Sequence, residues 1–223
     1  MNTFEELESG IRGLGRLYPT VFASASNARL TDESGQSYID FFAGAGVLNF
    51  GHNNEGMKTA LVDFIESDGV AHSLDMYTVP KRDFLRKFSE TILAPRGMKH
   101  RMQFMGPTGT NAVEAALKLA RKVTGRSDVV AFAHGFHGMT LGSLACTGNR
   151  YFRDAAGVGL DNVLRQPFGC DSPCAGCNLG CGTESIERLR ALYADSSSGL
   201  APPAAFLVET VQAEGGVRVA DKT

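Results

Sequence analysis

The sequence predicts an α/β fold in which a mostly parallel sheet is covered by helices on both faces. Two observations carry this prediction. From about residue 100, segments typical of strands alternate with segments typical of helices, which is the pattern of parallel sheets with helical crossovers. Within that pattern, residues 129–133 and 204–208 are almost entirely apolar, as expected of strands buried on both faces.

The alternating part of the chain divides into five expected elements. Strands are expected at residues 101–105, 129–133 and 204–210, and helices at 111–124 and 185–194. The apolar spacing of 3.6 residues sets the helices apart from the strands.

The helix at 111–124 has the clearest limits. Asn111 is a suitable N-cap, and Glu114 three residues later completes a pattern like a capping box. Gly125 is a natural C-terminal stop.

The first hundred residues predict shorter elements. Two short strands are expected around a turn at residues 32–35, and helices are expected at 56–69 and 80–93. The N-terminal segment has the apolar spacing of a short amphipathic helix.

Composition and charge exclude several classes of protein. Of the 223 residues, 43% are hydrophobic and 21% are charged, which is typical of a globular protein with a substantial core. The net charge of −2 gives no basic surface for nucleic acid. No apolar run approaches the roughly 18 residues of a membrane helix, and the acidic N-terminus does not resemble a secretory signal. We therefore expect a cytoplasmic protein without nucleic-acid or membrane partners.

The loop before the helix at 111–124 has the composition of an anion-binding site. Gly109 and Thr110 lie in a Pro-Thr-Gly-Thr stretch between the expected strand and the helix. A helix N-terminus has unpaired N–H groups and a partial positive charge, and glycine lets an anion approach the backbone. No Gly-Lys-Ser/Thr follows, so this is not a Walker loop. A plain capped helix explains the stretch equally well when it is taken alone.

Two further strand ends carry polar or aromatic residues. Phe136 and His137 lie between glycines after the strand at 129–133, and Glu209 and Glu214 follow the strand at 204–208. Ligands of parallel sheets bind outside the carboxyl ends of the strands. A phosphate cradle, an aromatic ring and two carboxylates together predict a site for a phosphorylated aromatic cofactor, although each residue alone is also compatible with a purely structural role.

These stretches resemble the class III aminotransferases, which use pyridoxal 5'-phosphate on the type I fold. The resemblance rests on "GPTGTNAVEAALKLARKVTGR", "GFHG" and "VETVQAEGG", and it extends through "YIDFFAGAGVLNFGHNN" and "ILAPRG". It covers essentially the whole chain except the cysteine-rich stretch near residues 170–182. The resemblance implies a cofactor-dependent enzyme with small amino acid and aldehyde substrates.

The resemblance also implies a role for each residue of the predicted site. Gly109 and Thr110 would bind the cofactor phosphate, and Phe136 would stack on the pyridine ring with His137 beside it. Glu209 would lie near the polar edge of the ring.

Two further residues match substrate positions in the family. Glu214 corresponds to a glutamate that pairs with a substrate-site arginine, and Tyr18 falls where some relatives place an aromatic residue that contacts the substrate. The implied reaction moves the amino group of L-glutamate to L-aspartate 4-semialdehyde, with an ω-aminotransferase acting on ornithine or 4-aminobutyrate as the alternative. A homodimer or higher homo-oligomer is expected.

The family's catalytic residue has no match in this chain. Its Schiff-base lysine lies downstream of the segment that corresponds to "VETVQAEGG", so we expect an N-terminal part of a longer enzyme that is inactive alone. Residues 1–50 would then be the N-terminal segment of the small domain. Residues 51–223 would be the first part of the large cofactor-binding domain, with its C-terminal part missing.

A cysteine cluster stands outside the resemblance. Cys170, Cys174, Cys177 and Cys181 have the spacing C-x3-C-x2-C-x3-C. Four thiolates so close together could hold zinc or an iron–sulfur cluster, which would place the protein in a different chemical class. Reduced free thiols are the other interpretation.

Overall fold

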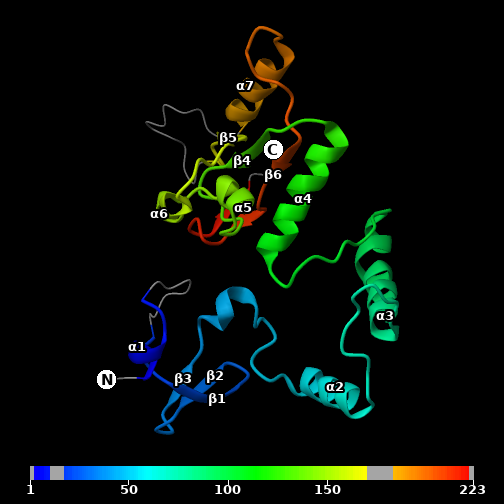
Figure 1. Ribbon diagram of the computed structural model, residues 1–223, viewed down its shortest axis with the longest axis vertical. Coiled ribbons are helices and arrows are strands. Elements are labelled where there is room, and N and C mark those ends of the chain that lie inside the picture. Colours follow the sequence, from blue (N-terminus) through cyan, green and yellow to red (C-terminus); the bar gives the residue numbers. More distant parts are fainter. Residues whose placement is uncertain (1–2, 11–17, 170–182, 221–223) are drawn as a thin grey trace. The chain divides into compact units, whose positions relative to one another are not determined.

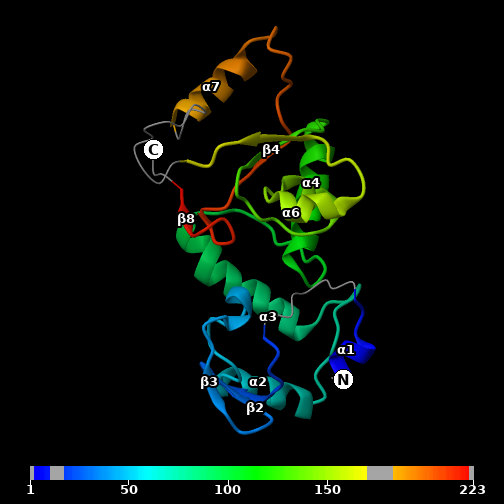
Figure 2. The same cartoon turned by 90° about the vertical axis from the view of Figure 1, so that its left-hand side faces the viewer.

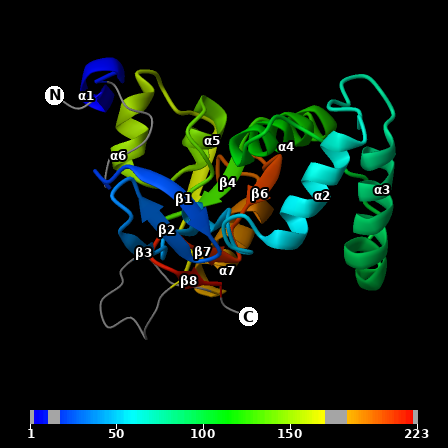
Figure 3. The same cartoon turned by 90° about the horizontal axis from the view of Figure 1, so that it is seen from below.

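The computed structural model, shown in Figures 1–3, describes residues 3–10, 18–169 and 183–220. The chain divides into two compact units, Met1–Lys99 and His100–Thr223, and each is described by itself. No helix in the described ranges is both long enough and apolar enough to cross a membrane.

The first unit contains a small antiparallel sheet followed by helices. Asp32 forms the turn between two of its strands, where its Oδ1 accepts the N–H groups of Ser34 and Gln36, both at 2.9 Å. The side chains of Asn54 and Thr78 cap the two longer helices. The elements are α1 (Thr3–Leu7), β1 (Phe22–Ser26), β2 (Arg29–Asp32), β3 (Ser37–Ile39), a 3₁₀ turn (Ala43–Gly46), α2 (Glu55–Glu66), α3 (Val79–Phe88), a π-helical turn (Ser89–Leu93) and a second 3₁₀ turn (Ala94–Arg96).

The second unit is built on a parallel sheet of three strands in the order β5-β4-β6. In Figure 3, β4 and β6 are seen between the labels of α5 and α7. The elements are α4 (Gly109–Thr124), β4 (Val129–Phe132), α5 (Leu141–Cys146), α6 (Arg150–Arg153), a 3₁₀ turn (Asp154–Ala156), β5 (Val163–Gln166), α7 (Thr183–Ala194), β6 (Ala205–Leu207), and a two-stranded antiparallel ribbon of β7 (Val211–Gln212) and β8 (Arg218–Val219).

The core of the second unit lies where α4 and α5 pack on the central strand. Val129 and Ala131 point to the same face of β4 because strand side chains alternate. Both are fully buried against Leu117 of α4 and Cys146 of α5. This packing fixes the start of α4 relative to the carboxyl end of β4.

The structure confirms the parallel sheet and the buried central strand, but it corrects one strand. Every residue of β4 is buried, as predicted. Residues 101–105, expected to be a strand, form none, because no described strand lies beside them to share hydrogen bonds. The third strand is instead β5, which the sequence analysis missed because its four residues include Arg165 and Gln166.

The start of α4 also differs from the prediction. The helix begins at Gly109 and its N-cap is Thr108, whereas Asn111 had been expected to be the cap. The Asn111 side-chain oxygen accepts the hydroxyl of Thr108 at 2.6 Å and its N–H at 3.3 Å. Glu114 therefore takes no part in the cap. The predicted stop at Gly125 is confirmed, since Gly125 has a φ of 69° at the C-cap.

The core contact of α4 can be tested with two leucines of the same helix. We expect Leu117→Ala to lower the free energy of unfolding by about 2–5 kcal/mol, because it leaves a cavity against the central strand. Leu119→Ala is the matched control, since Leu119 is 52% exposed and Leu117 only 3%. Urea unfolding monitored by circular dichroism measures both changes. Equal losses from the two substitutions would contradict the described packing.

Candidate functional site

Three loops meet at the carboxyl edge of the parallel sheet. The loop after β4 contacts the loop after β6 at two points: the Phe136 N–H donates to Glu209 Oε1 at 2.8 Å, and Gln212 Nε2 donates to the Ala133 carbonyl at 2.9 Å. The third contributor is the start of α4. The structure thus brings together the strand ends that the sequence analysis had singled out.

The start of α4 has room for an anion. A methyl group built on Gly109 would meet no atom within 4 Å. Gly109 and Thr110 are the first two residues of the helix, so their N–H groups have no partner within it. The hydroxyl of Thr110 lies 2.7 Å from that of Thr140, at the start of α5. Backbone donors and a hydroxyl are the groups that bind phosphate at helix N-termini.

Gly138 brings the loop after β4, which carries Phe136, against the start of α4. Its φ of 120° lies in the region that favours glycine, and a Cβ at this position would overlap the side chain of Thr110. Only a residue without a side chain allows so close an approach. Because Phe136 is two residues away, the phenyl-bearing loop is held next to the start of α4.

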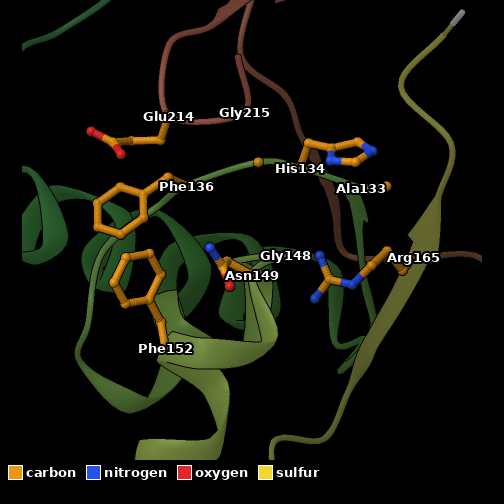
Figure 4. Close-up of a pocket in the computed structure, with 10 residues that line it drawn as sticks. Ala133, His134, Phe136, Gly148, Asn149, Phe152, Arg165, Glu214 and Gly215 are labelled. Carbon is orange, nitrogen blue, oxygen red and sulfur yellow. The ribbon is translucent and has the colours of Figure 1, made fainter.

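Phe136 lines a cavity of about 420 Å3 (Figure 4). Its ring packs edge to face with that of Phe152, with the centroids 5.5 Å apart. Figure 4 shows Glu214 beside Phe136 and Arg165 on the opposite side of the cavity. The remaining lining residues are Ala133, His134, Gly135, Gly148, Asn149 and Gly215.

His137 is buried and does not line this cavity. Its N–H donates to Thr147 Oγ1 at 3.0 Å, and its Nε2 has no hydrogen-bond partner among the described residues. Burial, and to a smaller extent the charge of Arg165, lower the pKa of His137, so the imidazole is neutral at neutral pH. A neutral ring beside the aromatic loop can donate or accept one hydrogen bond without adding charge.

Two arginines hold the end of α5, and the sequence analysis missed both. Arg153 Nη1 donates to the carbonyl of Ala145 at 2.8 Å and to that of Thr147 at 3.2 Å. Arg165 donates to the same two carbonyls through Nη2, at 2.8 and 3.2 Å. Cationic side chains at a helix C-terminus donate hydrogen bonds to its free carbonyl groups and interact favourably with the negative end of the helix dipole. Neither residue belongs to a local motif, so only the fold reveals their role.

Gln212 is the third residue that the sequence analysis missed. It is 1% exposed, and its Oε1 has no partner among the described residues. The quoted "VETVQAEGG" contains it between Glu209 and Glu214, and its burial could not be read from the sequence.

Tyr18 belongs to the first unit. There it lines a separate cavity of about 550 Å3, and its ring centroid lies 6.0 Å from that of Phe42. In the same unit His52 Nε2 and Asp40 Oδ2 form a hydrogen bond of 2.7 Å. The expected substrate contact of Tyr18 stays a prediction.

The cysteine cluster lies outside the described residues. Cys170, Cys174, Cys177 and Cys181 all fall within residues 170–182. Within the described ranges, no group of three or more histidine, cysteine or acidic side chains is arranged to hold a metal.

Comparison with solved structures shows the fold. The chain aligns over 97% of its length with an S-selective transaminase from Arthrobacter sp., with a TM-score of 0.74 and 22% identity. It aligns over 99% with the PLP-bound form of an amine transaminase from an uncultivated Pseudomonas species, with a TM-score of 0.70 and 24% identity. The chain covers 49% and 51% of these two proteins. The prediction of a type I fold that is incomplete in this chain is therefore confirmed.

Comparison with curated sequences shows the family. The chain is 51% identical to the diaminobutyrate–2-oxoglutarate transaminase of Halalkalibacterium halodurans over 99% of its length. It is 52% identical to that of Halomonas elongata over 97%, and 53% identical to that of Streptomyces anulatus over 99%. It spans about half the length of these relatives, 50–51%. The model of the family "aminotransferase class III" matches residues 15–223, and the chain belongs to this family.

Proposed function

We propose that the protein is a transaminase that moves the amino group of L-glutamate to L-aspartate 4-semialdehyde and gives L-2,4-diaminobutanoate and 2-oxoglutarate. The observation that carries the substrates is the sequence identity of about 50% to several diaminobutyrate–2-oxoglutarate transaminases over nearly the whole chain. The observation that supports the reaction class is the contact of Gly138 with Thr110, which joins an anion cradle to an aromatic ring.

The described residues fit pyridoxal 5'-phosphate in chemistry and in arrangement. The open space at Gly109 and the free N–H groups at the start of α4 suit its phosphate. Phe136 offers an aromatic surface close by, and it faces a cavity instead of the core. Bound there, pyridoxal 5'-phosphate would supply the electrophilic aldehyde and the electron-accepting ring that transamination requires.

The chain's own residues would bind and orient this cofactor. Gly109 and Thr110 would donate their N–H groups, and Thr110 also its hydroxyl, to the phosphate. Glu209 would act through the backbone of Phe136, because its carboxylate accepts that N–H and so fixes the loop that carries the ring. His137 would lie beside the ring site as a neutral group.

The two charged groups of the cavity suit a substrate with both acidic and basic groups. Glu214 is exposed and belongs to the loop after β6, where its carboxylate can bind or release a cation. Arg165 is held by carbonyl groups on the opposite side. None of the described cavity residues is a lysine, so the Schiff-base lysine would come from another part of the complete protein.

The proposed function also implies small-molecule substrates, an oligomeric state and a cellular localisation. Small-molecule amino acids and aldehydes are the partners that the family implies, and we propose a homodimer or higher homo-oligomer in the cytoplasm. An ω-aminotransferase acting on ornithine or 4-aminobutyrate is the alternative within the same family.

The substrate assignment can be tested on the complete gene product that contains this chain. Loaded with pyridoxal 5'-phosphate and supplied with L-glutamate and L-aspartate 4-semialdehyde, it should form L-2,4-diaminobutanoate, detected by chromatography of the derivatised amine. Ornithine and 4-aminobutyrate as amino donors are the controls, and we expect each to react at least about tenfold more slowly, a difference of 1.4 kcal/mol in transition-state binding. Faster reaction with either control would show that the alternative is correct.

The aromatic contribution can be tested by removing the ring of Phe136. We expect Phe136→Ala to weaken the binding of pyridoxal 5'-phosphate about tenfold, because an aromatic pair contributes up to ~1.5 kcal/mol beyond the buried area. Equilibrium dialysis measures the dissociation constant, and Phe206→Ala serves as the control, because Phe206 of β6 is 54% exposed and does not line the cavity. Unchanged binding by Phe136→Ala would show that the ring does not touch the cofactor.

A further inference from the structure

A set of hydroxyl groups and one carboxylate ties α4 to α5 directly beside the proposed cradle. Thr110 Oγ1 lies 2.7 Å from Thr140 Oγ1 and 2.5 Å from Ser143 Oγ. Thr140 in turn donates its hydroxyl to Glu114 Oε1 at 2.6 Å, and the Ser143 N–H donates to the same oxygen at 3.0 Å. We name these four residues the Glu114 network.

The carboxylate of Glu114 sets the direction of the hydrogen bonds in this network, because it is ionised. Burial alone would raise its pKa, but the hydroxyl of Thr140 and the N–H groups of Ser143 and Gly142 together lower it. An ionised carboxylate only accepts hydrogen bonds. Thr140 therefore directs its single hydroxyl proton to Glu114, and its oxygen is left to accept from Thr110 or Ser143.

The direction of the Ser143 proton decides what Thr110 can do. Ser143 Oγ lies 2.5 Å from Thr110 Oγ1, 2.9 Å from Thr140 Oγ1 and 3.0 Å from the Thr140 carbonyl oxygen, and its single proton can go to any one of them. When Ser143 donates to Thr110, the Thr110 proton is left for a ligand at the start of α4; when Ser143 donates to Thr140, Thr110 becomes the donor to Ser143. The same contacts hold its side chain in one place against Gly138.

The charge of Glu114 by itself would work against the proposed ligand. A carboxylate in the second turn of α4 repels a phosphate bound at the first turn. Its charge and its hydrogen bonds therefore have opposite effects on phosphate binding, and an isosteric neutral substitution separates them.

We infer that Glu114 is a positioning residue for the cradle: it fixes Thr140 and Ser143, and these hold the Thr110 hydroxyl at the start of α4, where a proton from Ser143 frees that of Thr110 for the ligand's phosphate. This inference rests on the proposed function. It adds a residue that touches neither cofactor nor substrate and acts only through its neighbours.

The test measures dissociation constants of the complete gene product for pyridoxal 5'-phosphate and for pyridoxal, which lacks the phosphate. In Glu114→Gln the amide can still accept at Oε1, but its Nε2 then faces backbone donors next to Gly142. We expect about tenfold weaker binding of pyridoxal 5'-phosphate, as for one lost hydrogen bond to a charged group, and unchanged binding of pyridoxal. Thr140→Val, which removes the hydroxyl, should weaken the binding of pyridoxal 5'-phosphate to the same extent. Thr140→Ser, which keeps the hydroxyl, should bind pyridoxal 5'-phosphate as the unaltered protein does.

A double-mutant cycle then shows whether Glu114 acts through Thr110. In a Thr110→Val background, Glu114→Gln should cause no further loss of affinity, because the hydroxyl that it positions is gone. Glu187→Gln, an exposed glutamate of α7, is the control and should bind as the unaltered protein does. Urea midpoints identify any variant that fails to fold.

Three outcomes would overturn the inference: tighter binding of pyridoxal 5'-phosphate by Glu114→Gln, an equal loss for pyridoxal, or additive losses in the cycle. The first would show that charge dominates, the second a general structural effect, and the third independent action. If the unaltered protein binds no pyridoxal 5'-phosphate, the proposed function fails and the inference fails with it.

Discussion

The close approach of Gly138 to Thr110 is the constraint on which the site depends. Thr110 belongs to the first turn of α4 and Gly138 to the loop after β4, and only the absence of a side chain at position 138 lets that loop reach the start of α4. Parallel strands place their carboxyl ends at one edge of a sheet, but this alone leaves neighbouring loops several ångströms apart. The Gly138 contact closes that distance, so an anion-binding helix start and an aromatic ring become one site.

Three other interactions in the second unit stabilise the elements that make this contact. Leu117 packs α4 on the buried central strand, Arg165 satisfies the carbonyl end of α5, and Glu209 holds the N–H of Phe136. Each of these interactions lies at a different level of the structure, from core packing to helix capping to a single side-chain hydrogen bond. Their common effect is to limit the movement of the loop at residues 135–138, as a preorganised binding site requires.

Much of this could be predicted from the sequence, because the relevant signals are local. Apolar runs marked the buried strand at Val129–Phe132, and glycine, threonine and helix-forming residues marked the start of α4. The order of strand ends along the chain was enough to expect that Phe136 and Glu209 meet. In contrast, residues 101–105 have the composition of a strand, but a strand also needs a neighbour, which no local pattern can supply.

The residues that were missed act over long distances in the sequence. Gln212 donates to Ala133, 79 positions away, and Arg165 contacts carbonyls 18 to 20 positions away. Glu114 looked like part of a capping box, yet its carboxylate accepts a hydroxyl from residue 140. The local pattern around each of these side chains is that of a surface helix or strand, and only the tertiary packing gives them their partners: α5 against α4 and β5 for Glu114 and Arg165, and the loop after β4 against β7 for Gln212.

A crystal structure of the complete gene product with pyridoxal 5'-phosphate tests the central claim most directly. The account predicts that the phosphate accepts the N–H groups of Gly109 and Thr110 and that the ring lies against Phe136. A phosphate bound elsewhere, or a ring on the far side of the Phe136 loop, would contradict it.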